Sequence, residues 1–100
     1  VVITNSSAGD ASDVEFNDTL PAFTTYTTGT IDVDTNGNEV FDVAGESEAD
    51  TVGIVTQAGS TIQVFAGTGG SEATDLGGNI TKLVSAPNNK SAIRYSITID

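Results

Sequence analysis

Short apolar runs separated by turn residues constrain the fold of this chain most strongly. Its 11 glycines and its clusters of Asn, Asp and Ser interrupt every apolar segment, and no window shows the i, i+3, i+4, i+7 spacing of a helix. This pattern predicts an all-β fold, an antiparallel immunoglobulin-like β-sandwich of seven to eight short strands. A chain of 100 residues holds one core, so a single domain spanning 1–100 is expected. The expected strands are 1–5, 11–17, 23–34, 38–43, 51–56, 61–67, 80–85 and 91–99.

The turn chemistry supports this division. Val14 and Phe16 lie two residues apart and so share one face of a strand. Pro21 cannot donate to a ladder and is expected to close that strand. The Asn36-Gly37 pair predicts a type I′ hairpin turn, because both residue types tolerate positive φ.

The opening segment resembles the start of a known repeat family. Residues 1–21 follow the pattern V-x-N-x-G-x-x-x-A-x-x-V-x-V-x-D-x-L-P, and the matching positions are Val1 or Ile3, Asn5, Gly9, Ala11, Val14, Phe16, Asp18, Leu20 and Pro21. This pattern is similar to that of the β-sandwich repeats called the domain of unknown function number eleven, which occur in secreted and cell-surface proteins of bacteria and archaea. Residues 59–100, with G-x-G and G-G turns and a terminal strand, resemble its closing half. The resemblance implies a structural surface module without catalytic activity.

Composition narrows the classes of function. The net charge is −11, from 14 acidic and 3 basic residues, so phosphate-rich partners such as nucleic acids and anionic membrane surfaces are not expected. No run of apolar residues is long enough for a membrane span. Without His or Cys the chain lacks the parts of a catalytic triad, a thiol nucleophile or a transition-metal site. We therefore expect a protein that is not an enzyme. The resemblance to surface repeats implies that it is located outside the cell, at the cell surface.

The side chains that could still bind a metal ion offer oxygen ligands, which suit Ca²⁺. The first candidate site is the acidic segment Asp42, Glu46, Glu48 and Asp50. The second choice is Asp32, Asp34 and Asn36, which begin like an EF-hand loop but meet Val43 where that loop needs a bidentate acid. For this second set, the alternative is that the aspartates lie on a solvated strand face.

Four N-x-Ser/Thr sequons are candidate glycosylation sites. They begin at Asn5, Asn17, Asn79 and Asn89, and the turn positions Asn5 and Asn79 are the favoured acceptors.

The two ends of the chain form the candidate polymerisation contact. Ile93, Tyr95, Ile97 and Ile99 alternate with polar residues and share one strand face. Members of the family that the chain resembles have a longer first strand, and this chain starts at Val1 and Ile3, near its expected end. We therefore expect residues 91–100 to act as a donor strand that pairs with residues 1–5 of another copy, head to tail. The alternative is that residues 91–100 belong to their own sheet.

Three functions follow from these observations. The first is a subunit of an extracellular filament or surface matrix that assembles by β-strand complementation. The second is one repeat of a long cell-surface adhesin stalk. The third, from another class, is a calcium-dependent carbohydrate-binding module, against which the absence of Trp counts.

Overall fold

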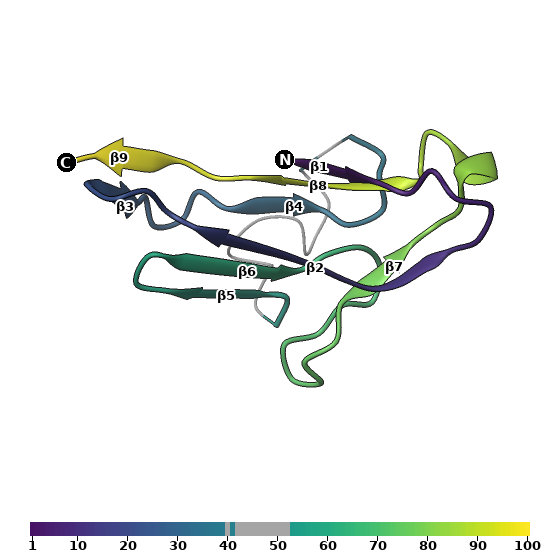
Figure 1. The fold of residues 1–100 in the computed structure, drawn as a ribbon, viewed down its shortest axis with the longest axis horizontal. Helices are drawn as coiled ribbons and strands as arrows, with labels where there is room; N and C mark the ends of the chain where they lie inside the picture. Colours follow the sequence, from purple (N-terminus) through teal and green to yellow (C-terminus); the bar gives the residue numbers. More distant parts are fainter. Residues whose placement is uncertain (40, 42–52) are drawn as a thin grey trace.

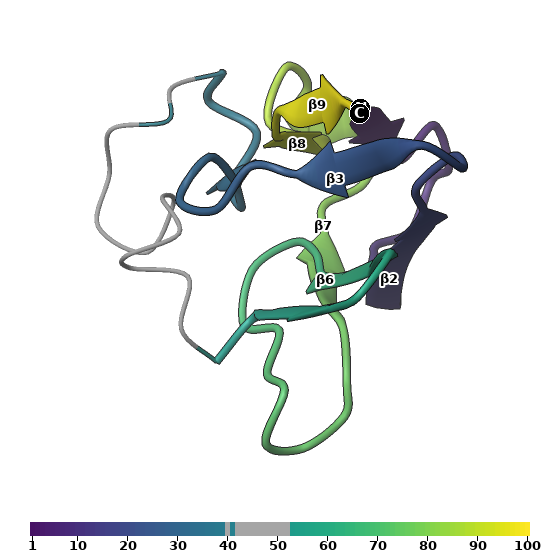
Figure 2. The same ribbon diagram turned by 90° about the vertical axis from the view of Figure 1, so that its left-hand side faces the viewer.

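A computed structural model describes residues 1–39, 41 and 53–100, and it confirms the antiparallel β-sandwich. One sheet has the order β1-β8-β4 and the other the order β5-β6-β2-β7, while β3 and β9 form a separate ribbon at one end. The two sheets lie one above the other, and their strands run along the long axis of the molecule (Figures 1 and 2). The strands are β1 Val2–Thr4, β2 Ala11–Thr19, β3 Thr24–Tyr26, β4 Asp32–Asp34, β5 Val55–Ala58, β6 Thr61–Phe65, β7 Gly78–Ile80, β8 Lys90–Arg94 and β9 Ile97–Ile99.

The core lies between the two sheets. Ile62 and Val64 point inward from β6, and Val33 and Ile93 point inward from β4 and β8, all of them buried. On β6 these residues alternate with the polar Thr61 and Gln63, as in a sheet with one solvated face. The other buried members of this cluster are Leu20, Tyr26, Ile31 and Ala66.

The strand predicted over 23–34 is in fact two strands, β3 and β4. Thr30 interrupts it, because its hydroxyl donates to the carbonyl of Thr27 at 2.6 Å and accepts from the amide of Ser96 at 3.0 Å. A side chain thus replaces a backbone partner in the ladder, and Gly29, in the turn between β3 and β4, has a positive φ of +83° that glycine tolerates.

Other predicted boundaries also shift. The strand expected at 80–85 ends at Ile80 and is followed by a 3₁₀ turn, η1 (Leu83–Ser85). The strand expected at 51–56 occurs as β5, a few residues later. The strand expected at 38–43 lies partly outside the described residues, and Asn38 and Glu39 are in bends.

The N-terminal strand pairs with the C-terminal segment inside one chain. Val2 lies opposite Ala92, and Ile3 lies opposite Ser91. Residues 1–5 and the C-terminal segment therefore pair within one chain, which agrees with the alternative that residues 91–100 belong to their own sheet. Pairing of these segments between copies stays a prediction. Pairing within one chain avoids the loss of translational freedom that association between copies incurs.

Candidate functional site

The C-terminal segment is one extended strand with different neighbours on its two edges. On one edge, the carbonyl of Ser96 accepts a hydrogen bond from the Thr27 amide at 3.0 Å, and the Asp100 amide donates a hydrogen bond to the carbonyl of Phe23 at 2.8 Å. On the other edge, the Ile93 amide donates to the Val1 carbonyl at 2.8 Å, and the Val1 ammonium donates to the Ile93 carbonyl at 2.8 Å. Backbone groups of even-numbered residues therefore face β4 and β3, and those of odd-numbered residues face β1.

Beyond Ile93 the β1 side of this strand is open. The backbone groups of Tyr95, Ile97 and Ile99 face that side, and no strand among the described residues pairs with them there. Figure 1 shows β9 extending past the N-terminus toward the end of the molecule, with β3 beneath it. We call the β1-facing edge of residues 95–99 the open edge. Unpaired edges of this kind are templates for strand addition.

Apolar side chains are exposed on β9 and at Phe23, which lies on the β3 side of β9 and not at the open edge. Ile97 is 40% exposed, and Ile99 and Phe23 are each 82% exposed. Ile93, on the same strand face, is only 1% exposed, and Tyr95 is partly buried against the core. The predicted contact face is therefore split: its inner end belongs to the core of the domain, and its outer end is accessible.

Phe23, which lies next to β9 on its β3 side, was not anticipated from the sequence. Its backbone has φ +64°, and its carbonyl accepts the last hydrogen bond of β9, from Asp100. A bulky residue rarely adopts this left-handed conformation, and strain of this type concentrates at functional positions. No sequence signal marks Phe23, and only its position next to β9 in the structure reveals its role.

Tyr95 connects the two layers where the buried and open parts of the strand meet. Its hydroxyl donates to a carboxylate oxygen of Asp18 on β2. Burial raises the pKa of Tyr95 to about 12, and the hydrogen bond and negative charge of Asp18 act in the same direction.

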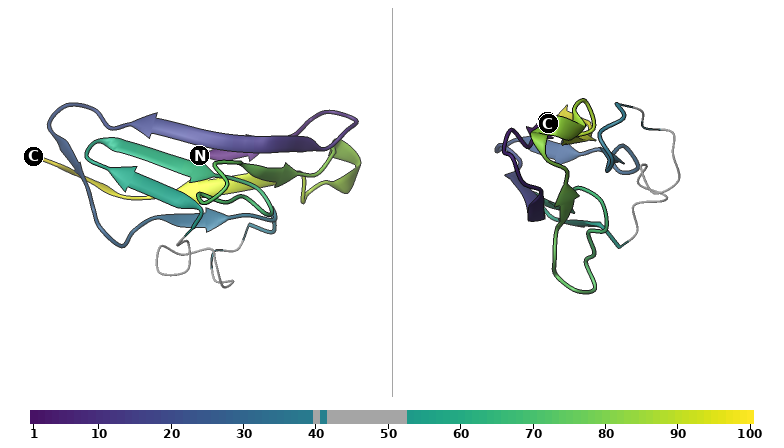
Figure 3. Two further views of the ribbon diagram at one scale, coloured as in Figure 1. Left: turned by 90° about the horizontal axis from the view of Figure 1, so that it is seen from below. Right: turned by 90° about the vertical axis from the view of Figure 1, so that its right-hand side faces the viewer.

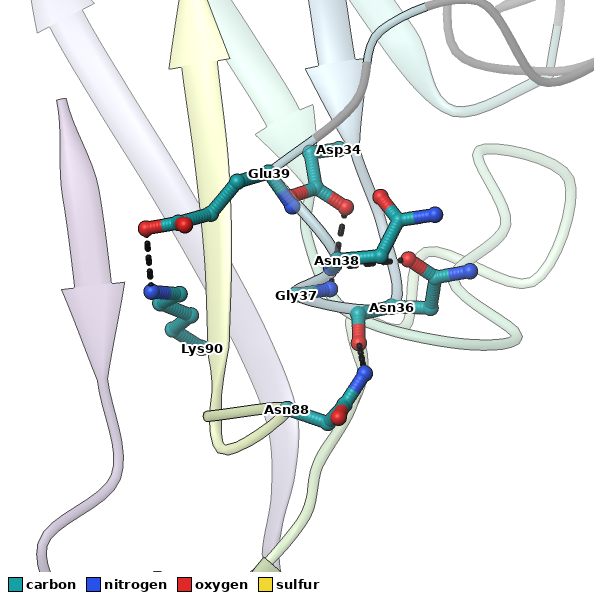
Figure 4. Close-up of polar contacts among 7 residues, drawn as sticks. All are labelled: Asp34, Asn36, Gly37, Asn38, Glu39, Asn88 and Lys90. Atoms are coloured by element: carbon teal, nitrogen blue, oxygen red, sulfur yellow. Dashed lines mark hydrogen bonds and ion pairs between the residues drawn. The ribbon is translucent and has the colours of Figure 1, made fainter. Parts of the chain in front are cut away.

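The second-choice calcium ligands have other partners in this structure, and calcium binding by Asp32, Asp34 and Asn36 stays a prediction. The buried carboxylate of Asp34 accepts the amides of Gly37 at 2.9 Å and Glu39 at 2.8 Å, so its oxygens cap a turn (Figure 4). Asp32 instead accepts from the Nε of Arg94 at 2.9 Å. Asn36 uses its side-chain oxygen to accept the Asn38 amide.

The same turn differs from the predicted type I′ turn. Gly37 has φ +75°, but Asn36 does not have positive φ, which a type I′ turn requires. A Cβ on Gly37 would lie 2.6 Å from the carbonyl of Lys90, so glycine is needed for close packing as well. Lys90 Nζ and Glu39 Oε1 are 2.5 Å apart, and the hydrogen bond and charge of this lysine lower the pKa of Glu39.

The first-choice calcium set, Asp42, Glu46, Glu48 and Asp50, lies outside the described residues and stays a prediction. Within residues 1–39, 41 and 53–100, no three acidic side chains gather as a metal site would require.

The four sequons fall into two structural classes. The buried amide nitrogen of Asn5 donates to the carbonyls of Gly9 at 2.9 Å and Ile80 at 3.0 Å, and that of buried Asn89 donates to the carbonyl of Asn5 at 2.9 Å. A glycan attaches at this nitrogen, so a glycan at Asn5 or Asn89 would displace these hydrogen bonds of the folded chain. Glycosylation at the four sequons stays a prediction. Asn17 and Asn79 are exposed and remain the candidate acceptors.

Comparison of the chain with models of protein families, with curated proteins and with solved structures gave no match. Among the described residues, no helix has the length and apolar character needed to cross a bilayer.

Proposed function

We propose that this protein is a structural subunit of an extracellular filament or surface matrix, joined to its neighbours by β-strand addition at the open edge. The observation that carries the proposal is the combination of backbone groups at Tyr95, Ile97 and Ile99 that no described strand pairs with and the exposed side chains of Ile97 and Ile99. Backbone pairing supplies affinity in this mode of recognition, and alternate side chains supply specificity.

The extracellular location rests on two features of the sequence. The net charge of −11 suits a highly solvated surface, and residues 1–21 resemble the repeats of surface proteins.

The energetic terms predict a reversible contact. Full burial of a large apolar side chain stabilises by about 1.5–3 kcal/mol, and each added backbone hydrogen bond contributes about 1 kcal/mol. Association opposes these terms with about 4–15 kcal/mol. The contact should therefore depend on protein concentration.

Proline substitutions test the proposal directly. Ile97→Pro removes an amide that faces the open edge, whereas Thr98→Pro removes one that faces Thr25 on β3. We expect Ile97→Pro to keep the circular dichroism spectrum and melting temperature of the parent but to lose self-association in sedimentation velocity. Thr98→Pro should instead lower the melting temperature, because it breaks a bond inside the domain.

Electron microscopy of concentrated protein provides the second readout. Fibres or oligomers in the parent that are absent in Ile97→Pro support the proposal. A parent chain that stays monomeric up to millimolar concentration, or an Ile97→Pro variant that associates as the parent does, would overturn it.

A repeat of a longer surface protein is the second candidate function. The pairing of β1 with β8 inside one chain favours it, since a tandem repeat must close its own sheet. A monomeric parent chain encoded within a long repetitive reading frame would select this candidate.

A further inference from the structure

The strand that carries the open edge has a self-complementary sequence. Residues 94–100 read Arg-Tyr-Ser-Ile-Thr-Ile-Asp. When this segment is set antiparallel to itself about Ile97, Arg94 lies opposite Asp100 and Ser96 lies opposite Thr98. On the other face, Tyr95 lies opposite Ile99, and Ile97 lies opposite itself. Each of these is a favourable cross-strand pair.

The backbone of the open edge fits this register. Antiparallel strands exchange both hydrogen bonds at alternate residue pairs. In this register the bonding pairs are Ile97 with Ile97 and Tyr95 with Ile99, and these are the residues whose backbone groups face the open edge. The symmetry of the sequence and the direction of the unpaired groups are independent observations, and they agree.

We propose that the occupant of the open edge is a second copy of this chain, paired antiparallel through the same edge on a two-fold axis at Ile97. This inference rests on the proposed function and specifies its partner. The contact is isologous, because each copy presents the same segment to the other, so it closes on two copies. It therefore supplies a dimeric unit of the proposed assembly, and growth beyond the dimer requires a second contact elsewhere on the surface. The two-fold contact extends each long C-terminal strand into a sheet that is continuous across both copies.

The charged residues favour the register centred on Ile97 over the registers centred on adjacent residues. The Nε of Arg94 donates to Asp32 of its own chain at 2.9 Å, and the Arg94 side chain is largely exposed. In the proposed pair, Arg94 lies between Asp32 on one side and Asp100 of the second copy on the other. A register centred on Ser96 or on Thr98 also sets odd-numbered residues opposite one another, but it leaves Arg94 without an opposing acid.

A single cysteine tests the axis, because the chain has no cysteine of its own. In the proposed pair the Cα atoms of the two Ile97 residues are about 5.5 Å apart, within the usual disulfide range. We expect Ile97→Cys to form a covalent dimer under mild oxidation, seen on a non-reducing gel. The matched control is Thr98→Cys, which faces Ser96 of the second copy and not itself, so it should crosslink far more slowly.

Mixing two variants tests the register. Ser96→Cys and Thr98→Cys should each crosslink poorly alone, yet should form a mixed dimer, identified by mass spectrometry, when combined. If Thr98→Cys crosslinks with itself as fast as Ile97→Cys does, the two-fold pairing at Ile97 is overturned.

Charge reversal provides a test that needs no oxidation. Asp100→Lys sets a lysine opposite Arg94 at both ends of the pair, and we expect it to weaken self-association about tenfold in sedimentation equilibrium. Glu15→Lys makes the same change of charge at an exposed position on β2 and should leave the association constant unchanged. If both variants change the association constant equally, the effect is due to net charge alone, and the pairing of Arg94 with Asp100 is overturned.

The outcomes separate this inference from the proposed function. If the parent associates, Ile97→Pro abolishes association, and Ile97→Cys stays folded but does not crosslink, the open edge binds a different segment or pairs head to tail, and only the two-fold pairing fails. If the parent never associates, both fail.

Discussion

Two consecutive parts of one strand, β8 and β9, differ in how they are held although their sequences alternate in the same way. β8 lies between β1 and β4, whereas β9 pairs with β3 alone. The difference is visible from below in Figure 3, where the C-terminal end projects beyond the paired strands. As a result, Ile93 is 1% exposed and Ile99 is 82% exposed. An alternating pattern thus indicates which residues share a face, while the neighbours of the strand decide whether that face is core or surface.

Truncation of Ile93 in β8 and of Ile99 in β9 should give the largest difference in stability between the two parts. Ile93→Ala leaves a cavity in the packed core and should lower the free energy of unfolding by about 2–5 kcal/mol. Ile99→Ala removes an exposed side chain and should change it by no more than about 0.5 kcal/mol. Urea denaturation of both variants measures the difference, and equal losses would contradict the division of the strand.

The turn that follows β1, and its contact with β7, can be tested by changing the side-chain amide of Asn5 to a carboxylate. Asn5→Asp removes the two bonds donated to Gly9 and Ile80 and sets a carboxylate against their carbonyls, so it should cost about 2–4 kcal/mol of stability.

The matched control makes the same change at an exposed sequon. Asn79→Asp should be nearly neutral in the same urea denaturation assay. An Asn5→Asp variant as stable as Asn79→Asp would show that the buried amide does not hold the turn. Glycan occupancy, if the native protein carries any, should map by mass spectrometry to Asn17 or Asn79.

At the outer part of the strand, we expect stability and association to respond in opposite directions. Phe23→Asn replaces a bulky residue at φ +64° by one that tolerates this conformation, so the free energy of unfolding should rise by about 1 kcal/mol. The same change removes an exposed aromatic side chain beside β9 and should weaken self-association. A variant that loses both stability and association would show that Phe23 packs within the domain.

Alkaline pH should loosen the junction at Tyr95. The folded chain raises the pKa of this hydroxyl to about 12, above its ordinary value of about 10. A raised folded-state pKa means that the stabilisation is complete below about pH 10 and is lost as the pH rises toward about 12. Denaturation midpoints measured across this range should fall more steeply for the parent than for Tyr95→Phe. Parallel profiles would rule out a contribution from the contact between Tyr95 and Asp18.

This chain's sequence by itself determined the fold class and the faces of its strands. Alternation at Ile62 and Val64, and again at Ile93, places these side chains on one face whatever their neighbours are. Turn residues marked most ends of the strands, because glycine and proline act through local backbone geometry. Neither signal could show that Thr30 would replace a backbone partner and divide residues 23–34 into two strands.

Only the tertiary structure decided the roles of the polar residues and of the chain ends. Asp34 could have been a calcium ligand or a turn cap, and Asn5 a glycan acceptor or a buried anchor, because each side chain has the chemistry for both roles. The choice depends on which amides and carbonyls come within about 3 Å, and those partners, such as Ile80 for Asn5, are distant in sequence. The same holds for the open edge: β1 pairs with β8 inside the chain, and among the described residues no strand pairs with residues 95–99 on that side.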